Sequence, residues 1–324
     1  MTKAGASIAI IAAAMLAPAG VTHADPAEPT DFATEIVAIE PATPAIRLGV
    51  VGGDSFVEMT VEPDNEVVVL GYWGEPYLRF NPDGTVEENR RSPTVAENAS
   101  RFGGSSPTGG GQTTGDSQWV EVASDRSYAW HDHRAHWMSR EPPAGERGGQ
   151  VVTSVIPLRV NGSEVQVSVA VVWEPAPSRI PVVAGAVIAV FAVLIVLSAG
   201  HRIAWVLAIT GTAAASVGWW QVISVPPETG PSSISWLLPA IAAAVAAVAV
   251  ALGRSLVSSA LVTLAGLQLA LWSFLRRDGL VKALLPTDAP FWLDRGVTAA
   301  AAVAGVAGIA AGVLGMLRLP ATES

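Results

Sequence analysis

Five long apolar stretches fill most of the second half of the sequence, and they constrain its fold more than any other feature. They cover residues 180–198, 203–223, 234–252, 256–275 and 297–317. Each is about as long as the roughly 20 apolar residues that a helix needs to cross a bilayer. No Asp, Glu, Lys, Arg or His lies near the middle of any stretch. The sequence therefore predicts an all-α bundle of about five transmembrane helices within residues 179–324. The outer faces of these helices are expected to contact membrane lipid.

The charged residues divide the chain into two parts. Residues 25–178 carry 23 acidic and 10 basic side chains, a net charge of −13, whereas the rest of the chain carries 5 acidic and 9 basic ones, a net charge of +4. A polar, acidic part followed by an apolar, mildly basic part indicates an exported domain joined to a membrane domain. The acidic balance disfavours a nucleic-acid partner. The short connections between the apolar stretches leave no room for a nucleotide-binding module.

Residues 1–24 have the pattern of a signal peptide. Lys3 supplies the positive charge, a short apolar run follows, and Thr22 and Ala24 place small residues at a cleavage site. We therefore expect a multi-pass protein of the cell membrane with its N-terminal domain outside the cytoplasm. The tryptophans that fall at the outer ends of the predicted helices agree with this layout; they are Trp219, Trp220, Trp236, Trp272 and Trp292.

The pattern within residues 25–178 is typical of strands and turns. Residues 46–51, 55–61 and 66–71 are short and rich in β-branched side chains, with turn residues between them. The clearest hairpin joins 151–160 to 164–173 through Asn161-Gly162, a pair that favours a type I′ turn. Six or seven such strands predict an all-β domain, an antiparallel sandwich of immunoglobulin-like type.

One motif in this domain contains several side chains that can bind metals, namely Trp130-His131-Asp132-His133-Arg134-Ala135-His136-Trp137-Met138. It holds three of the chain's five histidines, and neutral imidazole is a common ligand for zinc and copper. On a strand His131 and His133 share a face, and His136 joins them only if a turn intervenes. Asp132 could orient an imidazole or bind the ion itself, and the soft Met138 favours copper over zinc. These five residues form a candidate Cu or Zn site.

A second interpretation of the motif is a loop that is structural or docks an envelope protein. The tryptophans would then pack into the sandwich, and Asp132 would pair with an arginine. A segment with four aromatic residues, 71–80, could take part. The candidate residues for such a loop are Arg90, Arg91, Arg134, Trp130, Trp137, Tyr72, Trp73 and Tyr77. No Gly-x-Ser-x-Gly elbow accompanies the serines and histidines, so we predict no catalytic residue.

The last apolar stretch carries Gly305, Gly308, Gly312 and Gly315. Small residues let membrane helices approach closely, so this stripe predicts tight packing, either within one chain or in a homo-oligomer through the last helix. The chain has no charged residue in mid-membrane positions, where proton relays and ion pathways usually have one. A pump or ion-coupled transporter is therefore disfavoured.

The order of these segments resembles a family of uncharacterised actinobacterial membrane proteins. The resemblance covers most of the chain from Gly49 onward, and the tryptophan-flanked histidine motif is its most specific part. It also rests on 71–80, 89–93 and 285–295. It implies an exported domain and about five membrane helices, and it brings no activity. The exported domain is also similar to small copper-binding sandwich proteins of the bacterial envelope. The chain lacks their N-terminal histidine, so this similarity concerns the fold alone.

Overall fold

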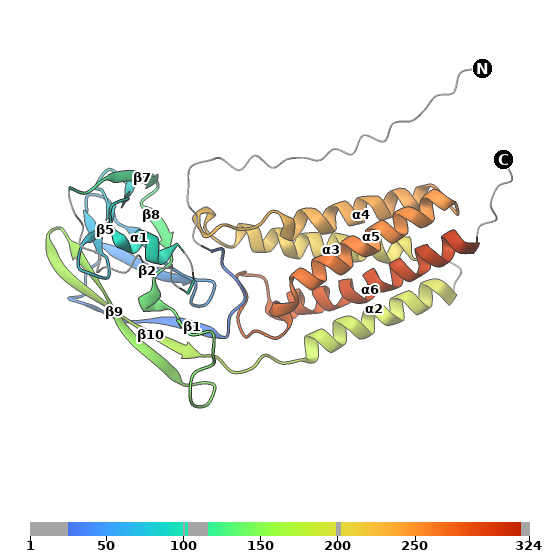
Figure 1. The fold of residues 1–324 in the computed structure, drawn as a ribbon, viewed down its shortest axis with the longest axis horizontal. Coiled ribbons are helices and arrows are strands. Elements are labelled where there is room, and N and C mark those ends of the chain that lie inside the picture. Colours follow the sequence, from blue (N-terminus) through green and yellow to red (C-terminus); the bar gives the residue numbers. More distant parts are fainter. Residues whose placement is uncertain (1–24, 100, 103–115, 199–201, 319–324) are drawn as a thin grey trace, which may run out of the picture.

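The computed structural model describes residues 25–99, 101–102, 116–198 and 202–318. A β domain lies at one end of the molecule and a bundle of long helices at the other (Figure 1). The predicted fold class, an antiparallel β-sandwich domain followed by a helical bundle, is confirmed. The predicted signal peptide, residues 1–24, lies outside the described residues.

The β domain contains ten strands in the described residues, more than the six or seven expected. The larger sheet has the order β1-β10-β9-β4-β5-β6-β7 and the smaller one β2-β3-β8. Immunoglobulin domains divide their strands more evenly between two sheets. The strands are β1 (Phe32–Glu40), β2 (Ile46–Val51), β3 (Phe56–Val61), β4 (Val67–Leu70), β5 (Pro76–Phe80), β6 (Val86–Asn89), β7 (Trp119–Ala123), β8 (Ser127–Trp130), β9 (Gln150–Val160) and β10 (Ser163–Trp173).

The two sheets share one hydrophobic core. Met59 from β3 and Trp130 from β8 are buried together with Phe80 from β5 and Leu158 from β9. Burial of a side chain of this size stabilises a fold by roughly 1.5–3 kcal/mol. The short helix α1 (Pro93–Asn98) adds Val95 at the edge of this core. Trp130 thus ties the start of the histidine motif to the centre of the domain.

The hairpin predicted from Asn161-Gly162 is confirmed. β9 and β10 pair in antiparallel register, with Ser163 opposite Val160. Asn161 has a φ of 50° and Gly162 a φ of 81°, as the two central residues of a type I′ turn require. The alternating valines of β10 face the core, which fixes the register of the strand.

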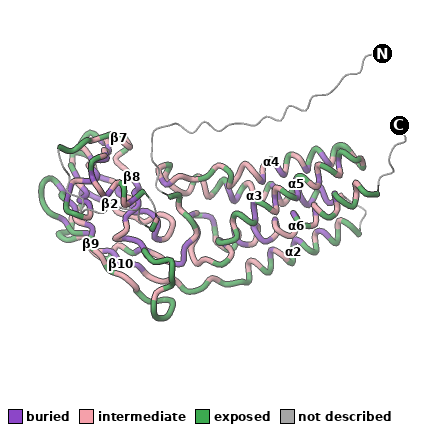
Figure 2. The backbone as a smooth tube through the Cα atoms, in the orientation of Figure 1, coloured by how far each residue is buried: buried purple, intermediate pink, exposed green. Residues whose placement is uncertain are grey.

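Five helices are long and apolar enough to cross a membrane, which supports a multi-pass membrane protein. Figure 2 shows buried residues on their inner faces and exposed residues along the outside of the bundle. The helices are α2 (Ile180–Ser198), α3 (Ala204–Ile223), α4 (Ile234–Ala251), α5 (Leu256–Leu275) and α6 (Phe291–Arg318). The first four agree with the predicted stretches to within one residue.

The start of α6 was predicted at residue 297 and is wrong by six residues, since the helix begins at Phe291. The charged pair Asp294-Arg295 caused the error, because charges at a helix end usually mark the limit of an apolar span. In the structure both charges are satisfied. Asp294 pairs with Arg276 at the end of α5. Arg295 donates to the backbone carbonyls of residues 279, 282 and 283.

The glycine stripe of α6 packs against other helices of the same chain. A Cβ atom on Gly305 would lie 2.7 Å from the backbone nitrogen of Ala270, and one on Gly312 would lie 2.2 Å from the hydroxyl of Thr263. Gly308 faces Leu207 of α3 in the same way, at 2.8 Å. The stripe therefore serves packing within one chain, which is one of the two alternatives that the sequence left open.

The β domain docks directly on the helix ends nearest to it. Thr30 and Leu284 form an isolated antiparallel bridge with hydrogen bonds of 3.1 and 2.9 Å. Asp31 pairs with Lys282 at 3.1 Å and accepts from the backbone N–H of Ala283. On the other side of the contact, Glu228 in the 3₁₀ turn η2 (Pro227–Thr229) accepts from the backbone N–H of Ala129. These bonds fix the β domain relative to the bundle.

Candidate metal centre and interdomain cavity

The histidine motif follows β8 and bends through a 3₁₀ turn, η1 (His133–Ala135). Asp132 caps this turn, because its side chain accepts from the backbone N–H of Arg134 at 3.0 Å. Ala135 is buried in the core, and its carbonyl accepts from the Thr34 hydroxyl of β1. The turn is the bend that the sequence argument required for His136 to reach the other histidines.

The three imidazoles gather around His131. Its ring centroid lies 5.1 Å from that of His133 and 5.2 Å from that of His136. His131 and His136 are both buried, at 4% and 1% exposure. Within the described residues, however, no three His, Cys, Asp or Glu side chains form a group that could hold a metal ion. The arrangement is a buried pair of imidazoles with a third beside it.

Hydrogen bonding fixes the tautomer of His131. The Nδ1 atom of His131 lies 2.6 Å from the backbone carbonyl of Ser55. Since a carbonyl only accepts, Nδ1 carries the hydrogen and Nε2 keeps a lone pair. The Nδ1 atom of His136 lies 2.7 Å from a carboxylate oxygen of Asp54, close but poorly aligned for a hydrogen bond. Both Nε2 atoms are buried without a hydrogen-bond partner among the described residues.

His131 is neutral near pH 7. Its burial, partly offset by the hydrogen bond to Ser55, lowers its pKa from 6.5 to about 4, and neighbouring His136, His133 and Arg101 act in the same direction as burial. A neutral imidazole with a free Nε2 lone pair is the form that binds metals. A buried acceptor that nothing satisfies is costly.

Asp54 connects the histidine pair to the rest of the domain. It is buried and forms a salt bridge of 2.7 Å with Arg101 in addition to its contact with His136. Burial alone would raise the pKa of Asp54, but His136 and Arg101 hold it below its usual value. Asp54 is therefore ionised and orients the imidazole of His136, as carboxylates do for metal-binding histidines.

The other predicted metal ligands have different roles. Asp132 is buried and accepts from Arg134 at 2.7 Å and from the indole of Trp130 at 3.0 Å. Burial would raise the pKa of Asp132, but Arg134 holds it low. His133 is stacked on Tyr72, with ring centroids 5.9 Å apart. Met138 is 38% exposed. Asp132 is thus committed to the turn, and Met138 faces away from the buried core.

The candidate residues of a partner-binding or structural loop do not form one surface. Trp130 and Tyr77 are buried in the core, and Tyr72 bonds to Asn98 and packs under Arg134. Only Trp73, at 49% exposure, offers a large aromatic side chain to solvent. The rest lie apart, with Arg90 beside Glu88 at 2.9 Å, Arg91 bonded to the Asp116 carbonyl at 3.0 Å, and Trp137 stacked on Phe32.

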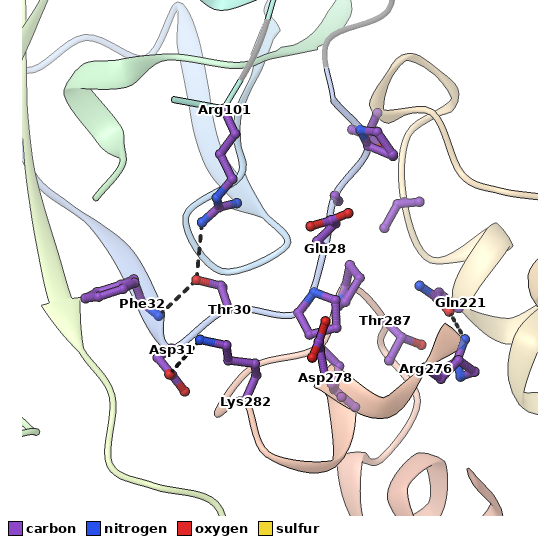
Figure 3. A pocket seen from close by; sticks show the side chains of 18 of the residues that line it. Glu28, Thr30, Asp31, Phe32, Arg101, Gln221, Arg276, Asp278, Lys282 and Thr287 are labelled. Atoms are coloured by element: carbon purple, nitrogen blue, oxygen red, sulfur yellow. Dashed lines mark hydrogen bonds and ion pairs between the residues drawn. The ribbon is translucent and has the colours of Figure 1, made fainter. Parts of the chain in front are cut away.

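A cavity of about 830 Å³ lies where the β domain meets the helix ends, and it contacts the histidine site through shared residues. Figure 3 shows Arg101 reaching toward Thr30 from the β domain, and Lys282 and Arg276 entering from the bundle side. Arg101 lines this cavity and also binds Asp54. Trp137 lines it next to His136 in the chain, and its backbone N–H donates to Asp54 at 3.3 Å.

Sequence reasoning missed Asp54, Ser55, Arg101 and the cavity. Gly52-Gly53-Asp54 carried only a turn signal, and Arg101 stood in a polar stretch without a motif. No protein-family model, curated protein or solved structure matches this chain.

Proposed function

We propose that the β domain is exported and binds one copper ion, as Cu(I), between His131 and His136. The observation that carries the proposal is the pair of buried Nε2 atoms, which have no hydrogen-bond partner among the described residues while each Nδ1 faces an oxygen atom. Two imidazoles that bind one ion at about 2 Å hold their ring centroids roughly 5 Å apart at a tetrahedral angle and roughly 6 Å apart in a linear pair. These rings are 5.2 Å apart, so a linear Cu(I) pair requires them to separate by about 1 Å.

The number of ligands favours copper over zinc. Zinc is almost always four-coordinate in proteins, whereas Cu(I) accepts two ligands. The ligand set proposed here is smaller than the sequence prediction, because Asp132 is held by Arg134 and Trp130. Asp54 orients the imidazole of His136, which is the role that the sequence argument gave to Asp132. His133 stands beside the site and is not assigned to it.

Titration of the full-length protein in detergent micelles tests the proposal. Cu(I) would be supplied under reducing conditions against a chromogenic chelator, with Zn(II) in parallel. His131→Asn and His136→Asn each keep an N–H at the Nδ1 position and remove Nε2. We expect one equivalent of Cu(I) for the wild type. Each variant should weaken binding more than about 100-fold, since losing even a residue that only hydrogen-bonds to a metal ligand costs about 10–100-fold in affinity.

His133→Asn is the matched control and should bind Cu(I) as tightly as the wild type. The proposal is overturned if the wild type binds no Cu(I), or if His131→Asn and His136→Asn bind it equally well. In that case the domain's role would rest on docking a partner protein, for which the exposed Trp73 offers an anchor.

Export of the β domain rests on the signal pattern of residues 1–24. The chain contains no cysteine, so single introduced cysteines report topology without background. Trp73→Cys should react with a membrane-impermeant maleimide on intact cells. Leu252→Cys, exposed at the opposite end of the bundle, should react only after permeabilisation. The reverse pattern would place the β domain in the cytoplasm.

A further inference from the structure

The cavity between the β domain and the bundle offers a second binding site, which is lined by neither histidine of the pair. It is lined by the segment before β1, by loops of the β domain, by the adjacent ends of α3, α4 and α5, and by the chain between α5 and α6. Pockets of a few hundred to about 1,000 Å³ are typical of sites for small ligands. The volume of about 830 Å³ falls in this range.

The walls of the cavity differ in polarity from one side to the other. The helix ends contribute Val222, Ile234 and Leu275. Charged side chains come from the β domain, as Arg101 and Arg140, and also from the chain around the end of α5, as Arg276, Asp278 and Lys282. A ligand that fills the cavity must therefore be an amphiphile, with its apolar part against Val222, Ile234 and Leu275 and its polar part against the charged side chains.

The position of the cavity relative to the membrane agrees with an amphiphile. The exposed tryptophans Trp219, Trp220 and Trp292 lie at the same ends of the helices. Tryptophan rings concentrate at the level of the lipid headgroups. Ile234 and Leu275 line the cavity and are about half exposed, so the apolar part of the cavity continues onto the outer surface of the helix ends.

The charged side chains that line the cavity indicate which kind of headgroup it can bind. Five cationic and five acidic side chains line the cavity. Asp31 forms salt bridges with two cations, Arg147 at 3.2 Å and Lys282 at 3.1 Å. Its single negative charge neutralises only one of them. Arg140 lies over the Phe102 ring at 4.9 Å and has no carboxylate partner among the described residues. Arg140, Arg147 and Lys282 thus share only the carboxylate of Asp31 in the salt bridges that the described residues form, and such cations suit a phosphate group.

The acidic side chains supply the opposite charge. Glu28, Glu141 and Asp278 line the cavity, are exposed and form no salt bridge within the described part of the chain. Carboxylates of this kind suit an ammonium group. We propose that the cavity binds one zwitterionic phospholipid of the surrounding leaflet, with its phosphate toward Arg140, Arg147 and Lys282 and its ammonium toward the exposed carboxylates.

Reconstitution of the full-length protein in nanodiscs tests this proposal. The discs would contain equal parts of phosphatidylethanolamine and phosphatidylglycerol, and native mass spectrometry would count the lipids retained after release. We expect one retained phosphatidylethanolamine per chain. Soluble glycerophosphoethanolamine and inorganic phosphate, added in separate arms, should not displace it, because neither fills the apolar half of the cavity.

Two pairs of variants separate this site from general lipid contact. Leu275→Trp should block the apolar half, whereas Leu271→Trp adds the same bulk one turn away, at an exposed position outside the cavity. Arg140→Gln should weaken retention about tenfold or more, since a charge-assisted hydrogen bond is lost. Arg277→Gln removes a charge next to the lining residue Arg276 without touching the cavity.

Thermal unfolding would confirm that all four variants remain folded. The proposal is overturned if the wild type retains no lipid, if phosphatidylglycerol is retained as well as phosphatidylethanolamine, or if Leu275→Trp and Leu271→Trp retain lipid equally. Displacement by inorganic phosphate alone would also overturn it, because the site would then be a simple anion site.

Discussion

Acid should destabilise the β domain through His131, at a pH well above that at which its aspartates begin to protonate. Above about pH 6.5 the imidazole is neutral in both the folded and the unfolded chain. Below that value the unfolded chain binds a proton, whereas folded His131, with a pKa of about 4, does not. Stability therefore falls as the pH drops from about 6.5 to about 4, and it is fully present only above this window.

The size of the effect follows from the two pKa values. Each pH unit between them changes the free energy of unfolding by about 1.4 kcal/mol. A pKa lowered from 6.5 to about 4 is therefore worth roughly 3 kcal/mol at the acid end of the window. For a domain of about 150 residues, this corresponds to a decrease in melting temperature of roughly 6–12 °C.

The assay is thermal unfolding of the full-length protein in detergent, from about pH 7.5 down to about pH 4. His131→Asn keeps an N–H for the Ser55 carbonyl and removes the titration. The variant should lose stability less steeply than the wild type across this window. Burial raises the pKa of Glu58 and of Glu88, so these two groups make the folded state more stable as the pH drops. This contribution is the same in the wild type and in His131→Asn, and it cancels when their stability curves are compared.

The aspartates act in a different window. Burial would raise the pKa values of Asp54 and Asp132, but their partners lower both below 3.8. The partners are His136 and Arg101 for Asp54, and Arg134 for Asp132. The stability that the aspartates contribute is lost only below about pH 4. If the wild type and His131→Asn show parallel stability curves between pH 4 and 6.5, the buried, neutral state of His131 is refuted.

Four further predictions test the metal centre, the bundle and the domain contact. Asp54→Asn should weaken Cu(I) binding by roughly 10–100-fold in the chelator assay while His131 and His136 remain in place. Gly266→Leu should destabilise the bundle by roughly 1–3 kcal/mol, because a Cβ there meets the Gly305 carbonyl at 2.7 Å; Leu267→Ala, at an exposed site, should have little effect on thermal unfolding. Asp294→Ala should cost roughly 3–5 kcal/mol by leaving Arg276 unpaired, and adding Arg276→Met should restore part of it in a double-mutant cycle. Thr30→Cys with Leu284→Cys should form a disulfide on mild oxidation, seen as a shift in gel mobility after cleavage between the domains, because opposite residues of an antiparallel bridge lie within disulfide reach.

The elements that the sequence predicts well are those that local physics determines. The hairpin of β9 and β10 follows from Asn161-Gly162 and the alternating valines beside it. Four transmembrane helices agree because their limits coincide with the limits of apolar composition. The start of α6 differs because Asp294 and Arg295 are satisfied by residues earlier in the chain, and composition contains no sign of such partners.

The candidate site depends on contacts that no local pattern encodes. The sequence placed three histidines within six residues, and the strand and helix alternatives each left one of them apart. The 3₁₀ turn capped by Asp132 resolves this by bending the chain between His131 and His136. The oxygen atoms that lie against their Nδ1 atoms belong to Ser55 and Asp54, in a loop 76 and 82 positions earlier in the chain. Only the chain topology brings this loop to the histidines.

The cavity is harder still to foresee, because it exists only where the β domain meets the helical bundle. Asp31 and Lys282 are 251 positions apart in the sequence and 3.1 Å apart in the structure. Each belongs to a segment that looks like an ordinary polar linker. Ion pairs of this kind contribute little when exposed, but Asp31 is buried at the contact and serves two cations at once. The same bonds that hold the β domain on the bundle therefore also build the charged wall of the cavity. A ligand bound there would touch both domains and strengthen their contact by mass action, so loss of the ligand and loosening of the domain contact should be observed together.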